Sequence, residues 1–274
     1  MSVKADANNT PAILTDITRC IGCRECVSAC KNVNNTEPDK PRRWQLEDGL
    51  SSRNWTSIIE KEQGYVRKQC RHCLEPACVS VCPVGALHTT KEGPVVYDSD
   101  KCLGCRYCMM ACAYGIPRYD WDQVVPYVRK CILCADRLKE GKEPACTSAC
   151  PVDATIFGTR GELLAEAHRR IEENPDTYDS RVWGEQQLGG TRVLYLAPKG
   201  MDLHFLTYGQ KVQDEPLPAT TRTAMHAVPF AFVGMGGAMA GIHWIVKRRQ
   251  KLQGDNPQHT EPPQTPEDGG EEKS

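Results

Sequence analysis

The sequence predicts an α+β fold of small cysteine-rich units with short strands and helices, followed by one C-terminal transmembrane helix. Two observations predict this fold. All 16 cysteines of the 274-residue chain fall into four runs of four, with none left over. Residues 225–246 contain no Asp, Glu, Lys or Arg, and a helix of this length, at about 1.5 Å per residue, crosses a hydrocarbon core roughly 30 Å thick.

The spacing of the cysteines indicates what they bind. Each run ends in CxxxC, a spacing that bacterial ferredoxins use to hold cubane iron–sulfur clusters. At four thiolates per cluster, 16 cysteines would hold four [4Fe–4S] clusters, so we expect two ferredoxin-like units with two clusters each. Such a chain is most simply a conductor of electrons. The expected ligands are Cys20, Cys23, Cys26 and Cys30 in run one; Cys70, Cys73, Cys78 and Cys82 in run two; Cys102, Cys105, Cys108 and Cys112 in run three; and Cys131, Cys134, Cys146 and Cys150 in run four.

A disulfide scaffold, a zinc protein and a nucleic-acid-binding protein are all disfavoured. A secreted disulfide scaffold usually has a shorter chain, a signal peptide and less regular spacing. Zinc ribbons usually pair two CxxC knuckles per metal, whereas runs one and three place three thiolates in one loop and a fourth one helical turn further on. Lys and Arg number 34 against 35 Asp and Glu, so the charge balance does not indicate a nucleic acid partner.

The runs are expected to work in pairs, because in two-cluster ferredoxins three cysteines of one run bind one cluster and the fourth binds the other. Runs two and three are neighbours in sequence, which leaves runs one and four to close around them. The alternative pairs run one with two and run three with four, and spacing alone does not exclude it. The first arrangement gives the groups Cys20, Cys23, Cys26 and Cys150; Cys30, Cys131, Cys134 and Cys146; Cys70, Cys73, Cys78 and Cys112; and Cys82, Cys102, Cys105 and Cys108.

Charged residues beside ligands are candidates for tuning the clusters, because nearby charge and hydrogen bonds set a cluster's reduction potential. For each of them the alternative is a solvated or partner-facing charge. The candidates are Arg24, Arg71, His72, Arg106 and Lys130.

The chain divides into seven expected segments. They are an N-terminal arm (1–15), the first run with a polar insertion (16–65), a two-cluster unit of runs two and three (66–128), the fourth run (129–160), a helix and loop extension that contacts partners (161–224), the transmembrane helix (225–246) and a disordered cytoplasmic tail (247–274).

Residue patterns predict four local elements outside the cysteine loops. Residues 95–97 and 192–196 are expected to be strands. The charged interval between Cys134 and Cys146 predicts a short surface helix and a turn. Apolar residues at helical spacing over 162–172 predict an amphipathic helix that covers the flank of a domain.

The span 225–246 is favoured as a membrane helix over a buried core helix. Its four glycines, at 234, 236, 237 and 241, weaken a helix in water but permit close packing in lipid. Basic residues follow it at 247–249 and 251, which by the positive-inside rule places the tail in the cytoplasm and the cluster domain on the periplasmic, outer face of the membrane.

Two further features concern the location of the protein. The first ten residues have no apolar segment and no twin arginine, so we expect export to depend on a signal carried by a partner. His226 and His243 lie near the ends of the apolar span, where the role of an interfacial anchor is favoured over that of a haem ligand or a proton path.

Several blocks of sequence together carry a resemblance to a known family. They are CIGCRECVSAC at 20–30, QCRHC at 69–73, CVSVCPVGA at 78–86, CLGCRYC at 102–108 and IFGTR at 156–160. With these blocks the chain resembles the electron-transfer beta subunits of respiratory complexes, above all of membrane-bound formate dehydrogenases and nickel–iron hydrogenases. The resemblance covers residues 14–200 and the anchor, and it implies that run one pairs with run four and run two with run three.

The resemblance implies a non-catalytic subunit that conducts electrons between a catalytic subunit and an integral membrane subunit, often a cytochrome b with haem, that reacts with quinone. A respiratory formate dehydrogenase is favoured, because its beta subunits typically have no signal of their own and a single C-terminal anchor. Hydrogenase counterparts usually begin with a twin-arginine signal, although the sequence around runs two and three is closer to theirs. The hydrogenase and other molybdopterin oxidoreductases therefore stay alternatives.

Two functions of other classes are also compatible with bound clusters. A structural or redox-sensing iron–sulfur protein would hold the clusters without passing current to a partner. An oxidoreductase enzyme is disfavoured, because the sequence has no flavin or nucleotide fingerprint and no spare cysteine to act on a substrate. We therefore expect no catalytic residue.

Overall fold

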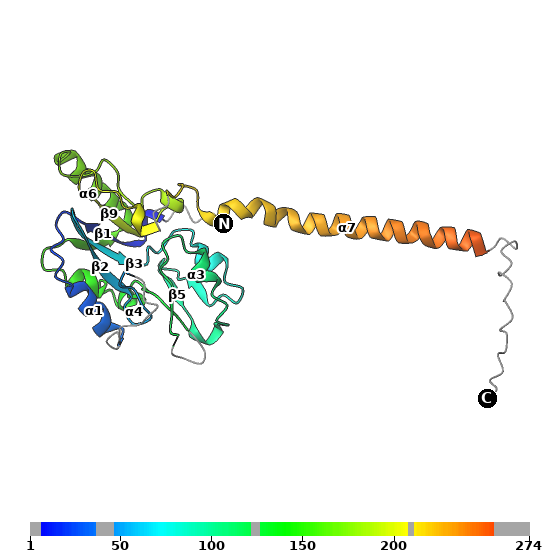
Figure 1. The fold of residues 1–274 in the computed structure, drawn as a ribbon, viewed down its shortest axis with the longest axis horizontal. Coiled ribbons are helices and arrows are strands. Elements are labelled where there is room, and N and C mark those ends of the chain that lie inside the picture. Colours follow the sequence, from blue (N-terminus) through cyan, green and yellow to red (C-terminus); the bar gives the residue numbers. More distant parts are fainter. Residues whose placement is uncertain (1–6, 37–46, 122–126, 208–210, 255–274) are drawn as a thin grey trace, which may run out of the picture. The chain divides into compact units, whose positions relative to one another are not determined.

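A computed structural model describes residues 7–36, 47–121, 127–207 and 211–254 of the chain. It forms two units, residues 1–220 and residues 221–274. The first unit contains all sixteen cysteines, and the second contains most of one long helix (Figure 1).

A three-stranded sheet organises the first unit, with β1 (Pro11–Asp16) between β8 (Thr155–Thr159) and β9 (Val193–Leu196). β1 pairs antiparallel with β8 and parallel with β9, so segments about 140 and 180 residues apart in sequence meet here. Residues 12–16 are all buried. The arm expected over residues 1–15 is therefore wrong for residues 11–15, which form the central strand, and residues 1–6 lie outside the described residues.

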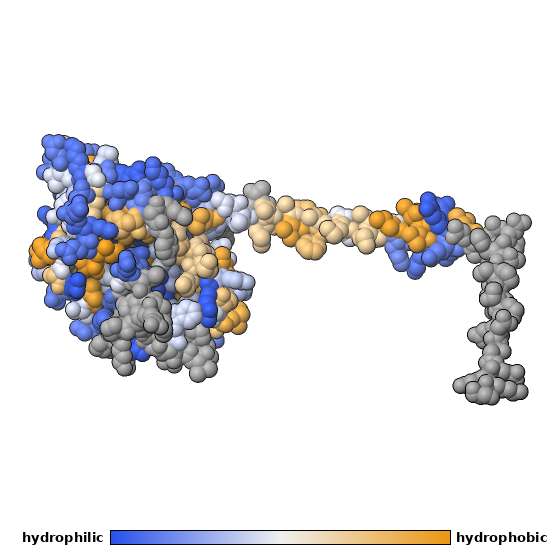
Figure 2. All heavy atoms as spheres, viewed as in Figure 1, coloured by the Kyte–Doolittle hydropathy of each residue, from blue (hydrophilic) through white to orange (hydrophobic). Residues whose placement is uncertain are grey.

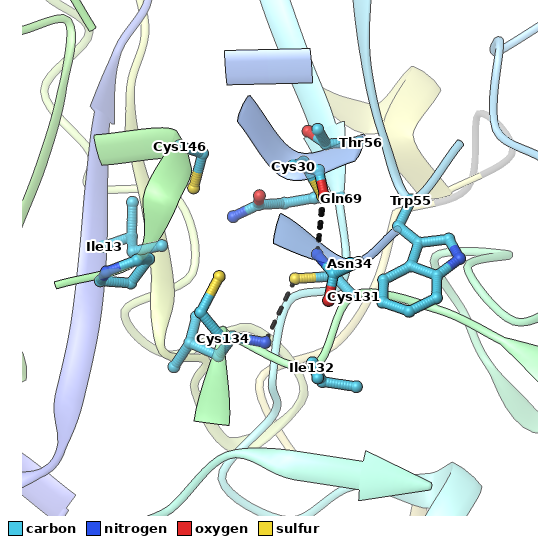
Figure 3. Close-up of a pocket in the computed structure, with 12 residues that line it drawn as sticks. Ile13, Cys30, Asn34, Trp55, Thr56, Gln69, Cys131, Ile132, Cys134 and Cys146 are labelled. Carbon is cyan, nitrogen blue, oxygen red and sulfur yellow. Dashed lines mark hydrogen bonds between the residues drawn. The ribbon is translucent and has the colours of Figure 1, made fainter. Parts of the chain in front are cut away.

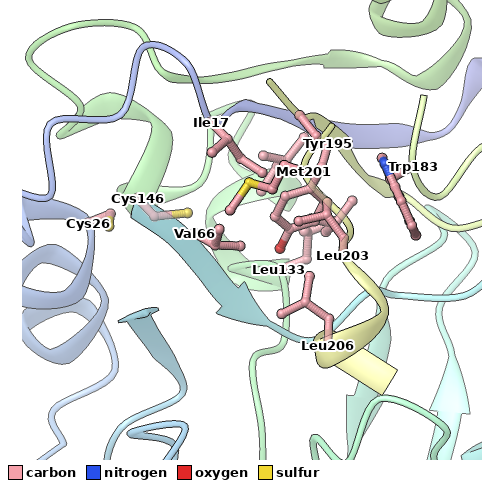
Figure 4. Close-up of a cluster of buried hydrophobic side chains, with 13 residues drawn as sticks. Ile17, Cys26, Val66, Leu133, Cys146, Trp183, Tyr195, Met201, Leu203 and Leu206 are labelled. Atoms are coloured by element: carbon pink, nitrogen blue, oxygen red, sulfur yellow. The ribbon is translucent and has the colours of Figure 1, made fainter. Parts of the chain in front are cut away.

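The core lies on both faces of this sheet. On one face, α6 (Arg160–Glu173) packs Leu163 and Ala167 against β1 and β9. Thr159 and Glu162 form a capping box at its N-terminus, which confirms the helix predicted over 162–172 and explains where it begins. On the other face, Ile13, Val66 and Tyr195 pack with Leu203 and Leu206, and Cys26 and Cys146 reach the edge of this cluster (Figure 4).

Three hairpins join the cysteine loops to the core. They pair β2 (Thr56–Lys61) with β3 (Gly64–Gln69), β4 (Leu87–Thr89) with β5 (Val95–Tyr97), and β6 (Arg118–Tyr119) with β7 (Val128–Arg129). β5 confirms the strand predicted over 95–97, and β9 confirms the one predicted over 192–196. The first hairpin crosses the boundary expected between the segments 16–65 and 66–128, because its second strand, β3, continues directly into run two.

Short helices carry many of the cysteines. They are α1 (Glu25–Val33), α2 (Ala77–Ser80), α3 (Tyr107–Ala111), α4 (Ala135–Lys139) and α5 (Ala145–Ser148), with single 3-10 turns η1 (Ala7–Asn9), η2 (Ser99–Lys101), η3 (Gln187–Gly189) and η4 (His204–Thr207). α4 confirms the short helix predicted between Cys134 and Cys146. α1 contacts α5 and α2 contacts α3, so run one meets run four and run two meets run three.

The second unit continues α7 (Leu217–Gly254), which is long and apolar enough to cross a membrane. Figure 2 shows apolar side chains along most of α7 and polar ones near its C-terminal end. Phe230 is 80% exposed and Val233 is 76% exposed, as expected for side chains that face lipid or a membrane partner. The helix includes residues 247–254, so the tail expected to be disordered from 247 is helical there; residues 255–274 lie outside the described residues.

Candidate iron–sulfur cluster sites

The four runs adopt two kinds of loop. Runs one and three share the pattern C-x-G-C-R-x-C, in which the glycine and the arginine both have positive φ. The values are 70° and 64° for Gly22 and Arg24, and 72° and 66° for Gly104 and Arg106. Each arginine is the N-cap of the helix that carries the third cysteine of the run. The two loops therefore present their thiols in the same way.

Runs two and four form the second kind of loop. The residue before the second cysteine has positive φ in both, 46° at His72 and 55° at Leu133. Each run then enters a short helix behind a proline N-cap, Pro76 before α2 and Pro144 before α5. Each pair of runs thus combines one loop of each kind, and the two pairs are structural counterparts.

The first pair of runs forms two thiol groups. One hollow is lined by Cys20, Cys23 and Cys26 from run one and by Cys150 from run four. A second is lined by Cys30 from α1 and by Cys131, Cys134 and Cys146 from run four. Figure 3 shows the second group around one space, with the sulfur atoms of Cys131, Cys134 and Cys146 turned into it. We call these groups A and B.

The second pair of runs forms two further groups. Cys73, Cys78 and Cys112 line one hollow, and the Cys70 thiol lies close enough to raise the pKa of Cys73 and Cys78, on which burial has the larger effect. This is group C. Burial raises the pKa of Cys108, and the neighbouring thiols Cys102, Cys105 and Cys82 raise it further. Cys82, Cys102, Cys105 and Cys108 are group D.

The groups follow one another in the order A, B, C, D. Arg67 influences the thiols of both A and B. Cys131 of group B packs in one cluster with Cys70 of group C, and Cys78 of group C packs in another with Cys108 of group D. The two exposed cysteines, Cys23 and Cys105, belong to groups A and D. The interior groups therefore lie between two exposed ends.

Burial and hydrogen bonds set the chemistry of the thiols. Burial raises the pKa of Cys26 to about 11 and of Cys30 to about 12, so uncharged thiols are favoured until a cation or an iron centre is present. Donors approach several sulfurs: the Gly104 amide lies 3.4 Å from Cys102 Sγ, the Leu133 amide 3.4 Å from Cys131 Sγ, and Asn34 Nδ2 3.6 Å from Cys30 Sγ. Such donors stabilise negative charge on sulfur.

The tuning candidates have different roles. Arg24 and Arg106 cap helices at exposed positions, and the Arg106 guanidinium carbon lies 4.4 Å from the Trp121 ring centroid. Arg71 is buried and stacks on Tyr195 at 3.9 Å. Arg71 and Arg106 therefore hold aromatic rings, whereas the Arg24 side chain makes no hydrogen bond to the helix that it precedes.

His72 and Lys130 are buried near group C. His72 Nδ1 accepts a hydrogen bond from the Val95 amide, and burial lowers its pKa, so the ring is neutral at physiological pH. Lys130 Nζ donates to the carbonyl oxygens of Val95 at 2.5 Å and Cys131 at 3.0 Å. Sequence reasoning missed Arg67, which is not adjacent to any cysteine but reaches two groups from β3.

The donor sets fit iron–sulfur clusters. Every cysteine is a free thiol, so no disulfide competes for the sulfurs. Among the described residues no three Cys, His, Asp or Glu side chains converge closely enough to hold a single metal ion, as a tetrahedral zinc site requires. Four soft thiolates around a hollow suit a cubane cluster, whose irons are spread over a larger volume.

Comparisons with known proteins indicate the same kind of cofactor. A 4Fe-4S dicluster domain matches residues 19–87, and another matches residues 62–160. The Hydrogenase-2 operon protein HybA of Escherichia coli O157:H7 is 36% identical over 297 aligned positions, which cover 90% of this chain and 89% of that protein. This chain belongs to the family of iron–sulfur electron-transfer subunits of respiratory complexes.

Two further relatives cover smaller parts of the chain. The B subunit of the anaerobic dimethyl sulfoxide reductase of Escherichia coli K12 is 40% identical over 54% of this chain and 73% of its own length. The iron-sulfur subunit of the nitrate-inducible formate dehydrogenase of the same strain is 36% identical over 68% of this chain and 67% of its own length. Like these relatives, the chain is an electron-transfer subunit of an oxidoreductase complex and not its catalytic subunit.

Proposed function

We propose that this subunit carries four [4Fe–4S] clusters and conducts electrons between a catalytic subunit and a membrane subunit that reacts with quinone. The observation that carries the proposal is the grouping of sixteen thiols into four sets of four that follow one another through the first unit. When bound, the clusters supply one-electron chemistry. The chain supplies the thiolates, the spacing and the hydrogen bonds that set the potentials.

In this proposal each cluster takes its ligands from both members of a pair of runs. Groups A and B bring run one together with run four, and groups C and D bring run two together with run three. The contacts of α1 with α5 and of α2 with α3 support this pairing over the alternative of one with two and three with four.

The two exposed ends are the proposed places of electron exchange. Beside exposed Cys23 lies Ile21, 57% exposed, and beside exposed Cys105 lies Leu103, 69% exposed. An apolar side chain left in water next to an electron-transfer centre is suited to a partner that excludes water on docking. Groups B and C lie between the two ends of the series, so electrons between the ends would pass through both.

A hydrogenase is the catalytic partner that the comparisons favour. The hydrogenase-2 operon protein aligns with 90% of this chain, whereas the formate dehydrogenase subunit aligns with 68% at the same identity of 36%. The longer alignment is the reason for placing the hydrogenase before the formate dehydrogenase. A formate dehydrogenase is the second candidate, supported by its own alignment over two thirds of both chains.

The subunit is proposed to be anchored in the cytoplasmic membrane by α7, with its C-terminal end in the cytoplasm and the clusters on the periplasmic side. Lys247, Arg248 and Arg249 at one end of the apolar span support this orientation. A haem-containing membrane partner is part of the same proposal. His226 and His243 both lie on α7, and an anchor role at the membrane interface is proposed for them.

The test is anaerobic isolation of the full chain with its partners, followed by metal analysis and electron paramagnetic resonance. We expect about sixteen irons per chain and four reducible clusters. Reduction of the clusters by hydrogen but not by formate would identify a hydrogenase, and the reverse a formate dehydrogenase. About four zincs per chain, or clusters that neither substrate nor quinol can reduce, would refute the conductor; the second result would favour a redox sensor.

A further inference from the structure

Arg67 is a buried cation for which the described part of the chain offers too few partners. It lies on β3, and its side chain and backbone together are only 1% exposed. An arginine side chain stays charged in proteins. A buried charge is tolerated when it is paired or fully hydrogen-bonded, because it has lost its hydration shell.

The N–H groups of Arg67 are mostly unsatisfied. Nη2 donates a 3.4 Å hydrogen bond to Thr15 Oγ1, while Nε and Nη1 have no hydrogen-bond partner among the described residues. Arg160 shows the usual arrangement: its Nε, Nη1 and Nη2 donate to Thr191 O, Asn8 Oδ1 and Glu185 O at 3.0, 3.1 and 2.6 Å. The unsatisfied donors of Arg67 therefore point to an acceptor that is not part of the polypeptide.

The surroundings of Arg67 identify the place of that acceptor. The residue lines the hollow of group A together with Cys20, Cys26 and Cys150. The Arg67 side chain also donates a hydrogen bond to the thiol of Cys146, which belongs to group B. Burial lowers the pKa of Arg67 itself, but Cys146 and Cys26 raise it above its ordinary value. The guanidinium thus lies between the two groups.

In the second pair of groups, the buried lysine Lys130 does not offer unpaired donors as Arg67 does. Lys130 lies near Cys78 of group C, but two backbone carbonyl oxygens accept hydrogen bonds from its Nζ. Its charge acts on group C from a distance, whereas the unpaired N–H groups of Arg67 can contact sulfur directly. Arg71 is a buried arginine near Cys73 of group C, but its guanidinium stacks on the Tyr195 ring and its Nη1 donates to the Val193 carbonyl oxygen.

We propose that the Arg67 guanidinium lies between the clusters of groups A and B, donates N–H hydrogen bonds to their sulfur atoms, and thereby raises the reduction potentials of both. This inference rests on the clusters assigned under the proposed function. A cluster with four thiolate ligands is an anion that gains one further negative charge on reduction. A fixed cation and its hydrogen bonds stabilise the reduced form more than the oxidised form. Arg67 is in this sense a positioning and tuning residue.

The test compares four forms of the full chain, each isolated anaerobically with its partner subunits: wild type, Arg67→Met, Arg67→Lys and the control Arg160→Met. Redox titration followed by electron paramagnetic resonance gives the four couples. In Arg67→Met we expect the midpoint potentials of two clusters to fall. At a fixed potential the ratio of reduced to oxidised cluster should drop at least tenfold for each, which corresponds to about 59 mV for a one-electron couple. The other two couples should stay in place.

The remaining variants separate charge, geometry and structure. Arg67→Lys should lower the same two couples by less, because an ammonium keeps the charge but loses the planar array of donors. Arg160→Met should leave all four couples unchanged. A second readout uses arginine labelled with ¹⁵N in the guanidinium group alone: the reduced wild-type clusters should show magnetic coupling to this nitrogen, and Arg67→Lys should lose it.

Every result of these measurements supports or refutes the role of Arg67. The role would be overturned if the midpoint potentials in Arg67→Met equal those of the wild type, or if Arg160→Met shifts them by the same amount. If Arg67→Met fails to retain clusters, the Arg67→Lys couples and the nitrogen coupling decide, and absence of both effects refutes the role. A wild-type chain without about sixteen irons removes the proposed function and this inference together, whereas a full complement of iron with unmoved couples removes only the inference.

Discussion

At the scale of single residues, Arg67 differs from the cysteines in that no local pattern in the sequence marks it. The ligand pattern is local, because CxxxC and CxxC spacings put thiols on one loop or one helical turn. Arg67 belongs to no such pattern: it precedes Cys70 by three residues, and only the pairing of β3 with β2 brings it to groups A and B. From the sequence alone, a charged residue in a strand is expected to face solvent. Its burial against cysteine side chains depends on tertiary packing, which the local pattern does not reveal.

Gly22 provides a test of the loop geometry in run one. Its φ is +70°, and a Cβ at this position would lie 2.7 Å from Tyr65 Cδ1. Gly22→Ala should therefore add a steric clash to the roughly 1 kcal/mol that a positive φ costs an alanine. We expect earlier loss of visible cluster absorbance in an anaerobic urea titration than for the wild type.

Gly85→Ala is the matched control for that substitution. Gly85 has a φ of +64°, but nothing lies within 4 Å of the place that a Cβ would take, so only the backbone cost applies. Equal effects of the two alanines would show that contact with the Tyr65 ring does not matter.

At the scale of elements, strands and helices defined by local pattern were predictable. The helix over 162–172, the strand over 95–97 and the helix in the fourth run are all present. β1 was missed because its strand partners, β8 and β9, are contributed by the far end of the domain. A short apolar segment without turn signals does not reveal such pairing, and its position near the N-terminus favoured an arm.

Removal of apolar volume from α6 should destabilise the first unit without touching a cysteine. Leu163 is 4% exposed and packs against the sheet. Leu163→Ala should lower the free energy of unfolding by about 3 kcal/mol through lost burial and the cavity that remains. Leu164→Ala, at a partly buried neighbour, should cost less. The measurement is anaerobic denaturation followed by circular dichroism, and a larger loss for Leu164→Ala would contradict the packing described.

A chain that ends at Thr220 should separate anchoring from cluster binding. The first unit contains all sixteen cysteines and ends at this residue. We expect the truncated chain to retain its iron and to leave the membrane fraction when produced without partners. Retention in the membrane would show that another surface provides the anchor, and loss of iron would show that α7 is needed for folding.

At the scale of the whole molecule, the four thiol groups form a single series with one exposed group at each end. The same kind of loop, C-x-G-C-R-x-C, provides both ends. Each end therefore displays an apolar residue in the same loop position, Ile21 in one and Leu103 in the other. Two similar exposed ends of one series fit the proposed conductor between two different partners.

Substitutions at the two ends should separate the two partners. Ile21→Asp and Leu103→Asp place a charge on an apolar contact, which should slow electron exchange with one partner each by roughly tenfold or more, the effect of about 1.4 kcal/mol. Rapid-mixing spectroscopy with substrate on one side and quinone on the other would separate the steps. Iron content should not change.

Ala165→Asp is the control for these variants, because Ala165 is exposed on α6 and lies in none of the thiol groups. It should leave both steps unchanged. If Ile21→Asp and Leu103→Asp impair the same step, the two ends do not serve different partners.

The exposure of Cys23 and Cys105 determines where oxygen would damage the protein first. In the proposed function these two cysteines mark the places of electron exchange, and as the exposed cysteines they are also the ones that dissolved oxygen reaches most readily. Oxidative damage should accordingly begin at groups A and D. A sample kept aerobically would still be brown and rich in iron after it had lost its connection to both neighbours.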